Sequence, residues 1–207
     1  MTLEGGEGAG KSTQTGLLVA ALAGAGIAAE RTREPGGSRG AEDIRGLLLE
    51  GDRERWDAVS EALLLYAARR DHVVRLIRPA LAAGTWMVAD RFADSTLAYQ
   101  GYGRGLPLAD LQALHRFALG DFRPDMTVIL DLPVEEGFAR IGRRALLGDR
   151  FERLDRDFHQ RLRDGFLAIA QSDPARCVVI DATGDRDSVH RAVLAAVGAR
   201  LGIALAP

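Results

Sequence analysis

Short hydrophobic runs alternate along this chain with longer segments in which apolar residues recur every three or four positions. A short run bounded by turn residues is typical of a buried strand, and the longer spacing is typical of an amphipathic helix. Strands and helices that alternate in this way form parallel sheets. The pattern therefore predicts an α/β fold, with about five parallel strands and helices on both faces. The strands are expected at Met1–Glu4, Ile27–Arg33, Thr85–Ala89, Met126–Leu132 and Cys177–Asp181.

The longest helical pattern runs from Trp56 to Ala83. Apolar positions such as Leu63, Ala67 and Val74 follow the helical spacing within it. A helix of about 28 residues would be roughly 40 Å long, at 1.5 Å per residue. We expect one helix that borders most of the molecule.

Length and composition limit the class of protein. The 207 residues favour one domain, residues 1–207. A formal net charge of -2 argues against nucleic acid as a partner. The longest uncharged stretch, 12–29, is interrupted by glycines, so no membrane span is expected. The single cysteine, Cys177, fits a reducing compartment, and we predict a cytoplasmic protein.

The strongest chemical signal lies just after the first predicted strand, where the sequence GGEGAGKST matches the template G-x-x-x-x-G-K-[ST]. Backbone N–H groups of such a loop surround phosphates, its lysine contacts the terminal phosphates and its hydroxyl binds Mg²⁺. Lys11 is the only lysine beside 26 arginines, which suggests that a compact ammonium is required there. The loop predicts ATP and Mg²⁺ as ligands. Its residues are Gly5, Gly6, Glu7, Gly8, Ala9, Gly10, Lys11, Ser12 and Thr13.

A phosphate loop alone does not distinguish a motor, a switch and a kinase. A guanine-specific switch would need the motif N-K-x-D, which a chain without asparagine cannot supply. Asp90 and Arg91 follow the third predicted strand, at the carboxyl end where ligands bind to open parallel sheets. Asp90 is placed to act on Mg²⁺ or its waters, and Arg91 to bind a phosphate.

Asp90-Arg91-Phe92, together with several other segments in order, resembles the thymidylate kinases of bacteria over essentially the whole chain. The resemblance implies the P-loop NTPase fold and transfer of the ATP γ-phosphate to dTMP, giving ADP and dTDP in dTTP synthesis. It also implies a homodimer, for which the long helix offers a face. The other matching segments are Arg33–Gly37, Leu63–Arg69, Asp94–Gly101, Gly120–Asp125 and Ile180–Thr183.

The resemblance also implies roles for single residues. Glu7 would bind the sugar 3′-hydroxyl, which explains a carboxylate in a loop that attracts phosphate. Arg69 would contact a ring oxygen of thymine, and Arg45 and Arg91 would hold the dTMP phosphate. Lys11, Asp90 and Arg91 would be catalytic, and Ser12 and Asp90 would bind Mg²⁺. The residues expected to bind dTMP are Glu7, Arg45, Leu65, Arg69, Arg91, Thr96 and Gln100.

Family members with Glu7 but no neighbouring arginine supply the catalytic arginine from a lid over ATP. That lid is expected within residues 140–150, and Arg143 or Arg144 is the candidate. Arg186, after the fifth strand, is expected near adenine.

Two features depart from the family. Leu65 occupies the position where the family has a phenylalanine that stacks on thymine. Without that aromatic ring, base binding would lose on the order of 1 kcal/mol of stacking free energy. A kinase of another small nucleotide or deoxynucleoside, or a P-loop ATPase switch or partition protein, therefore remains an alternative. Only residues 1–4 precede the loop, so we expect the natural chain to start further upstream. The four histidines, among them His72, are expected to serve only packing or surface roles.

Overall fold

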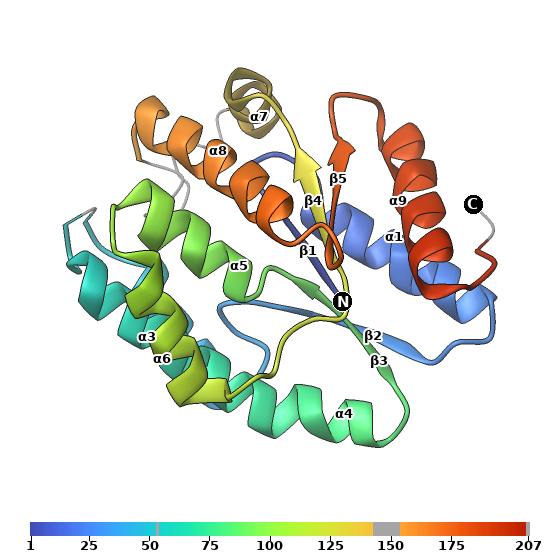
Figure 1. The fold of residues 1–207 in the computed structure, drawn as a ribbon, viewed down its shortest axis with the longest axis horizontal. Helices are drawn as coiled ribbons and strands as arrows, with labels where there is room; N and C mark the ends of the chain where they lie inside the picture. The colour runs from blue at the N-terminus through green and yellow to red at the C-terminus, as the bar shows by residue number, and fades with distance from the viewer. Residues whose placement is uncertain (53, 143–153, 206–207) are drawn as a thin grey trace.

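The computed structural model describes residues 1–52, 54–142 and 154–205, and its centre is a five-stranded parallel sheet (Figure 1). The strand order is β2-β3-β1-β4-β5. Every predicted strand is confirmed, with its ends shifted by at most two residues, and so is the α/β fold. The strands are β1 (Thr2–Gly5), β2 (Ala29–Arg33), β3 (Trp86–Asp90), β4 (Thr127–Asp131) and β5 (Cys177–Asp181).

Helices cover both faces of the sheet (Figure 1). Because successive side chains of a strand point to opposite faces, β4 contributes to two cores. Val128 and Leu130 pack with α1 (Lys11–Gly24) and α9 (Arg186–Leu201). Ile129 packs with α8 (Arg156–Ser172) and with the π-helical segment η2 (Leu97–Gly103) that continues α5 (Ala93–Thr96). The remaining helices are α2 (Arg39–Leu49), α3 (Ala58–His72), η1 (Val73–Ile77), α4 (Arg78–Ala82), α6 (Leu108–Leu119) and α7 (Val134–Ile141).

The predicted long helix is present as the continuous run α3, η1 and α4, but its start was predicted too early. Asp57 is the N-cap: its side chain accepts hydrogen bonds from the backbone N–H groups of Val59 and Ser60, at 2.9 and 3.0 Å. Trp56 therefore lies before the helix. The run widens into one π-helical segment just before Pro79, a residue that cannot donate the hydrogen bond an α-helix needs. Among the helices described here, none is long and apolar enough to cross a membrane.

Candidate active site

The loop between β1 and α1 has a backbone that favours glycine. Gly5 and Gly8 have φ angles of 133° and 72°, in the left-handed region that other side chains rarely adopt. A Cβ atom on Gly8 would also lie 2.4 Å from the backbone oxygen of Gly137, at the start of α7. The loop therefore keeps a fixed shape at the N-terminus of α1, where backbone N–H groups favour a phosphate.

Lys11, the first residue of α1, is 7% exposed beside this loop. Its Nζ donates a 2.6 Å hydrogen bond to the backbone oxygen of Gly6. Burial lowers the pKa of the ammonium, and the positive charge of Arg91 lowers it further. Because these two cations repel each other, a bound phosphate anion would stabilise both.

Asp90 and Arg91 lie at the carboxyl end of β3, beside the loop. The strand register pairs Asp90 with Leu3 of β1 and so places both segments together. The Ser12 hydroxyl donates a hydrogen bond to the Asp90 carboxylate. Two hard oxygen ligands therefore meet beside the phosphate loop, a set that suits Mg²⁺.

Glu7 forms a compact cluster with Arg91 and Tyr99. Nη2 of Arg91 donates to Oε1 of Glu7 at 2.7 Å, and the Tyr99 hydroxyl donates to the same oxygen. Burial alone would raise the pKa of the Glu7 carboxyl, but Arg91, Lys11 and the Tyr99 hydrogen bond outweigh it and lower the pKa to about 2. Glu7 is therefore an ionised acceptor at neutral pH.

Beneath this cluster lies a second, fully buried carboxyl, that of Glu4 on β1. It accepts hydrogen bonds of 2.6 Å from the backbone N–H of Phe92 and from the Ser95 hydroxyl. Burial, and then the charge of Asp94, raise its pKa to about 8. Arg91 has a left-handed φ of 71°, and Glu4 holds the peptide that follows it. Glu4 thus links the strand of the phosphate loop to the segment that carries Arg91.

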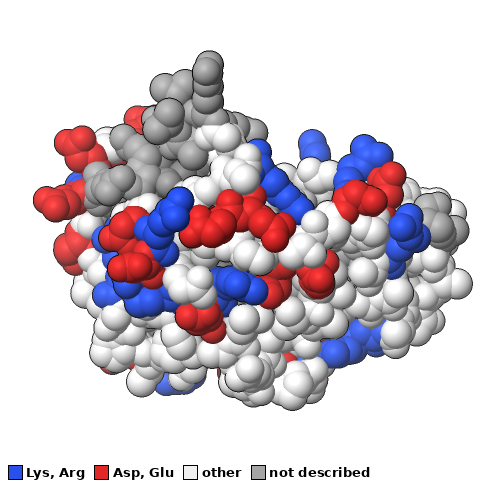
Figure 2. Space-filling view, turned by 90° about the horizontal axis from the view of Figure 1, so that it is seen from above, with Lys and Arg blue, Asp and Glu red and all other residues white. Residues whose placement is uncertain are grey.

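A cavity of about 540 Å³ opens in front of the loop. Its wall contains the loop residues that would face phosphate, and it contains every residue that the sequence assigned to dTMP. Charges of both signs are interspersed on the face seen in Figure 2. The sequence-predicted residues that line the cavity are Glu7, Gly8, Gly10, Lys11, Ser12, Thr13, Arg45, Leu65, Arg69, Asp90, Arg91, Thr96 and Gln100.

In the wall of this cavity, Arg69 is 2% exposed and held on several sides. Its Nε donates to Oε2 of Glu34 at 2.6 Å, and Nη2 donates to the Thr96 hydroxyl and the Phe92 backbone oxygen at 3.0 and 3.1 Å. The guanidinium lies over the Tyr66 ring, 4.6 Å from its centroid. Nη1 is buried and has no hydrogen-bond partner among the described residues. A side chain in the cavity wall therefore keeps one unused donor.

Gln100 keeps an unused acceptor in the same wall. Its Nε2 donates to Oε1 of Glu61 at 2.7 Å, whereas its Oε1 is buried and has no partner in the part of the chain that the structure describes. Arg45 reaches the cavity from α2, and its Nη1 donates to the Pro35 backbone oxygen at 2.6 Å.

Six predicted residues are not among the described residues that line this cavity. Gly5, Gly6 and Ala9 belong to the phosphate loop itself but do not line the cavity wall. Arg186, the first residue of α9, is exposed and pairs with Asp187 at 2.7 Å, so its place at adenine stays a prediction. Arg143 and Arg144 lie outside the described residues. Arg140, just before them, lines the cavity, and its Nη2 donates to the Thr183 backbone oxygen at 2.9 Å.

The sequence did not predict two residues that form hydrogen bonds with the predicted site residues Arg69 and Glu7. Glu34 lies in the matched segment Arg33–Gly37 without a role assigned to it, yet its carboxylate accepts a hydrogen bond from the buried Arg69. Tyr99 falls within a matched segment without a role assigned to it, yet it donates to Glu7. A glutamate beside a buried arginine far along the chain leaves no local signal, so only the fold reveals the pairing.

A phosphate loop and a second pocket that open into one cavity form the site of a nucleotide kinase with the P-loop NTPase fold. The family model for thymidylate kinase matches residues 3–193. A thymidylate kinase from Caulobacter vibrioides is 52% identical over 98% of this chain and 97% of its own length. One from Nitrobacter hamburgensis is 53% identical over 99% and 90%. The crystal structure of thymidylate kinase from Ehrlichia chaffeensis superposes with a TM-score of 0.76 at 35% identity, covering 95% of this chain and 96% of its own.

The chain therefore belongs to the thymidylate kinase family, whose members are ATP-dependent nucleoside monophosphate kinases.

Proposed function

We propose that this protein transfers the γ-phosphate of ATP to the phosphate of dTMP, giving ADP and dTDP for dTTP synthesis. A dTMP phosphate oxygen attacks the γ-phosphorus, and the bond to the β-phosphate oxygen breaks. The observation that carries the proposal is the single cavity that joins the phosphate loop to a pocket with an unused donor and an unused acceptor.

The unused atoms fit a thymine base. Thymine presents ring carbonyl oxygens that accept hydrogen bonds and a ring N–H that donates one. Nη1 of Arg69 can donate to a carbonyl, and Oε1 of Gln100 can accept from an N–H. A buried polar atom without a partner costs about 1–3 kcal/mol, which base binding would recover.

The phosphate end of the cavity supplies positive charge. In phosphoryl transfer the protein mainly positions the reactants and neutralises charge. Lys11 would hold the terminal phosphates of ATP, and Arg91 and Arg45 would hold the dTMP phosphate. Glu7, kept ionised by Arg91 and Lys11, would accept a hydrogen bond from the sugar 3′-hydroxyl.

Ser12 and Asp90 would hold Mg²⁺ together with the phosphates of ATP. The described residues contain no group of three or more acidic, histidine or cysteine side chains that could hold a metal alone. Magnesium in such sites needs only one or two protein ligands besides phosphates and water, so the pair fits it. When bound, Mg²⁺ neutralises charge that develops on the phosphates.

A lid arginine completes the proposed site. Arg143 or Arg144 would neutralise the moving phosphoryl group as residues 140–150 close over ATP and exclude water. The test is kcat of Arg143→Ala and Arg144→Ala, measured separately. A catalytic arginine should lower kcat on the order of a hundredfold, and a normal kcat in both variants would contradict the assignment.

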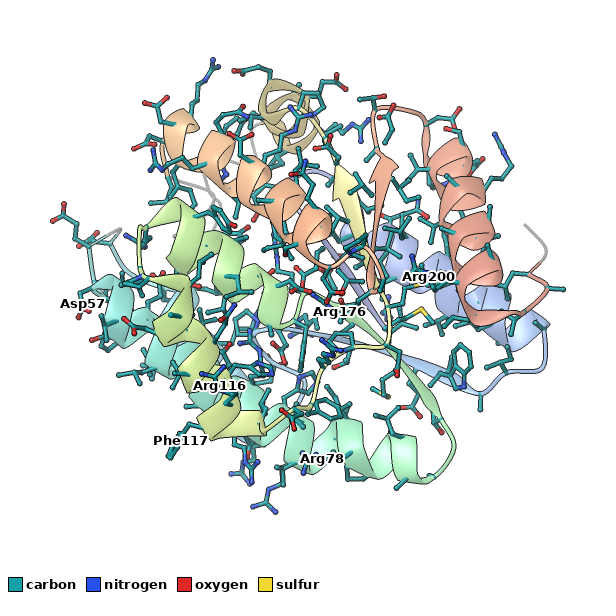
Figure 3. The ribbon with its side chains drawn as sticks, viewed as in Figure 1. Asp57, Arg78, Arg116, Phe117, Arg176 and Arg200 are labelled. Carbon is teal, nitrogen blue, oxygen red and sulfur yellow. The ribbon has the colours of Figure 1, made fainter. Side chains whose placement is uncertain are left out.

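We also propose a homodimer, formed through an exposed apolar stripe on α3. Val59 and Leu63 are 54% and 53% exposed. Arg70, on the same side of α3, donates to the backbone oxygen of Ala118 and so brings the end of α6 to this stripe. There Phe117 is 90% exposed and points away from the body of the molecule (Figure 3).

Leu63→Asp should convert the dimer to a monomer in sedimentation, whereas the same change at the exposed Leu81 on α4, Leu81→Asp, should not. A monomeric wild-type protein would refute the dimer.

A cytoplasmic location stays a prediction from the lone cysteine, Cys177, which is buried and free.

The reaction is tested by ADP release with ATP and Mg²⁺ in the presence of dTMP, dUMP, dCMP, CMP, AMP or thymidine. We expect dTMP to be the best acceptor. Release without any acceptor would favour an ATPase switch, stimulation by thymidine alone would favour a deoxynucleoside kinase, and no stimulation by any monophosphate would refute the proposal. Lys11→Met should remove activity while circular dichroism stays unchanged.

A further inference from the structure

A buried chain of hydrogen bonds reaches Arg69 from the sheet. The Thr32 hydroxyl on β2 lies 2.7 Å from Nε2 of His72, and Nδ1 of His72 lies 3.0 Å from Oε1 of Glu34. The other carboxylate oxygen of Glu34 accepts the Nε hydrogen bond of Arg69 at 2.6 Å. His72 is fully buried, and Glu34 is 6% exposed. The two ends of this series of hydrogen bonds, Thr32 on β2 and Arg69 on α3, are both fixed by secondary structure. His72 lies three residues after Arg69, on the same face of α3.

The chain leaves each of its members little freedom. Because the Glu34 carboxylate can only accept, Nδ1 of His72 carries the proton that they share. The backbone of Gly37 closes over the ring: a Cβ there would lie 2.4 Å from Nε2 of His72 and 2.7 Å from the Thr32 hydroxyl. The imidazole therefore cannot turn without moving this loop, and Glu34 cannot rotate while His72 holds its second oxygen.

A fixed Glu34 determines where the free donor of Arg69 points. The guanidinium is planar, so the bond at Nε sets the direction of Nη1. The rings of Tyr66 and Phe92 lie 4.6 and 5.4 Å from the guanidinium carbon and confine the plane further. Within residues 1–52, 54–142 and 154–205, Nη1 is the part of this group that has no hydrogen-bond partner.

We propose that His72, supported by Thr32, is a positioning residue that aims Nη1 of Arg69 through Glu34. It thereby makes the enzyme prefer a pyrimidine that presents a carbonyl oxygen, and not an amino group, at the ring position opposite Nη1. This inference rests on the proposed dTMP kinase function. Thymine and uracil present an acceptor at that position, whereas cytosine presents an amino group, which would place two donors face to face in a buried site. When Nη1 of Arg69 is held in a fixed direction, the enzyme should reject cytosine. When Nη1 can rotate away from the base, the enzyme should accept cytosine more readily.

The test compares His72→Leu with His72→Asn, two side chains of similar shape. The Asn Nδ2 atom takes roughly the place of Nδ1 in histidine and can still donate to Glu34, whereas Leu cannot. In His72→Leu we expect the KM for dTMP to rise about tenfold with little change in kcat, and the dTMP-to-dCMP ratio of kcat/KM to fall about tenfold. His72→Asn should recover most of that ratio, and direct dTMP binding measured by calorimetry should follow the same order.

Two further variants make the result decisive. Thr32→Val removes only the hydroxyl at nearly constant volume and should lower the ratio in the same direction, which keeps the inference testable if His72→Leu does not fold. His190→Leu changes a histidine on α9, which covers the other face of the sheet, and should leave the ratio between acceptors unchanged.

A role in packing alone would lower the melting temperature of His72→Leu and His72→Asn alike and leave the acceptor ratio at its wild-type value. That outcome would overturn the inference. A wild-type enzyme inactive on dTMP would instead refute the proposed function itself.

Discussion

Replacing Glu4 with glutamine should change how the stability of this protein depends on pH. The carboxyl is completely buried under the phosphate loop, and burial followed by the charge of Asp94 raises its pKa to about 8 from an ordinary value near 4.5. Between these two values the folded protein keeps a proton that the unfolded chain releases. The contribution of Glu4 to stability is therefore fully present below pH 4.5 and is lost as the pH rises through 8.

The size of the effect follows from the two pKa values. At about 1.4 kcal/mol per pH unit, the interval from 4.5 to about 8 corresponds to a loss on the order of 5 kcal/mol above pH 8, of which about 3 kcal/mol is lost by pH 7. Glutamine has nearly the same shape and keeps an oxygen for the Phe92 N–H, but it does not titrate in this range. The variant should therefore lack this part of the pH dependence.

Urea unfolding at a series of pH values from 5 to 9 measures the effect. The free energy of unfolding of the wild type, minus that of Glu4→Gln, should fall from pH 5 to about pH 8 and then level off. Glu30→Gln, which changes an exposed carboxyl on β2, is the matched control and should show no such trend. If the Glu4→Gln and wild-type curves run parallel, the folded and unfolded chains hold the Glu4 proton equally, the pKa is not raised by folding, and the reasoning is wrong.

Two other predictions concern the base pocket and the support beneath α5. Leu65→Phe places an aromatic ring in the cavity wall and should lower the KM for dTMP several-fold, because stacking on a base contributes on the order of 1 kcal/mol. An unchanged or higher KM in steady-state kinetics would argue against contact between residue 65 and the base. Arg176 (Figure 3) binds the buried Asp94 carboxylate through its guanidinium at 2.6 and 3.0 Å. Arg176→Met leaves that carboxylate without its partner and should lower the free energy of unfolding by about 3–5 kcal/mol in chemical unfolding, whereas Arg176→Lys should lower it less. Equal stability of Arg176→Met and the wild type would contradict this prediction.

Local signals explain what the sequence predicted well. The five strands are short apolar runs bounded by turn residues, and the phosphate loop is a continuous nine-residue pattern, so neither needs knowledge of distant contacts. The start of α3 was misjudged because helical spacing continues through Trp56, while the hydrogen bonds of Asp57 decide where the helix begins.

Long-range contacts explain what the sequence did not predict. The histidines were expected to serve only packing or surface roles. His72, however, forms hydrogen bonds with Glu34 and Thr32, which lie 38 and 40 positions away. That contact exists only once α3 docks beside β2. A buried histidine bonded to a carboxylate has the same sequence signature as any other histidine on a helix, so its partner must be found in the structure.

The position of β1 in the sheet bears on the order in which the chain is made and folds. β1 lies at the centre, and Thr2 pairs with Ala89 on one side and with Thr127 on the other. During synthesis these neighbours leave the ribosome long after the phosphate loop does, and pairing between such distant segments forms slowly. A strand that is made before both of its neighbours is thus among the last to be completed, and a nascent chain that ends before β4 cannot hold nucleotide in the way the finished protein does.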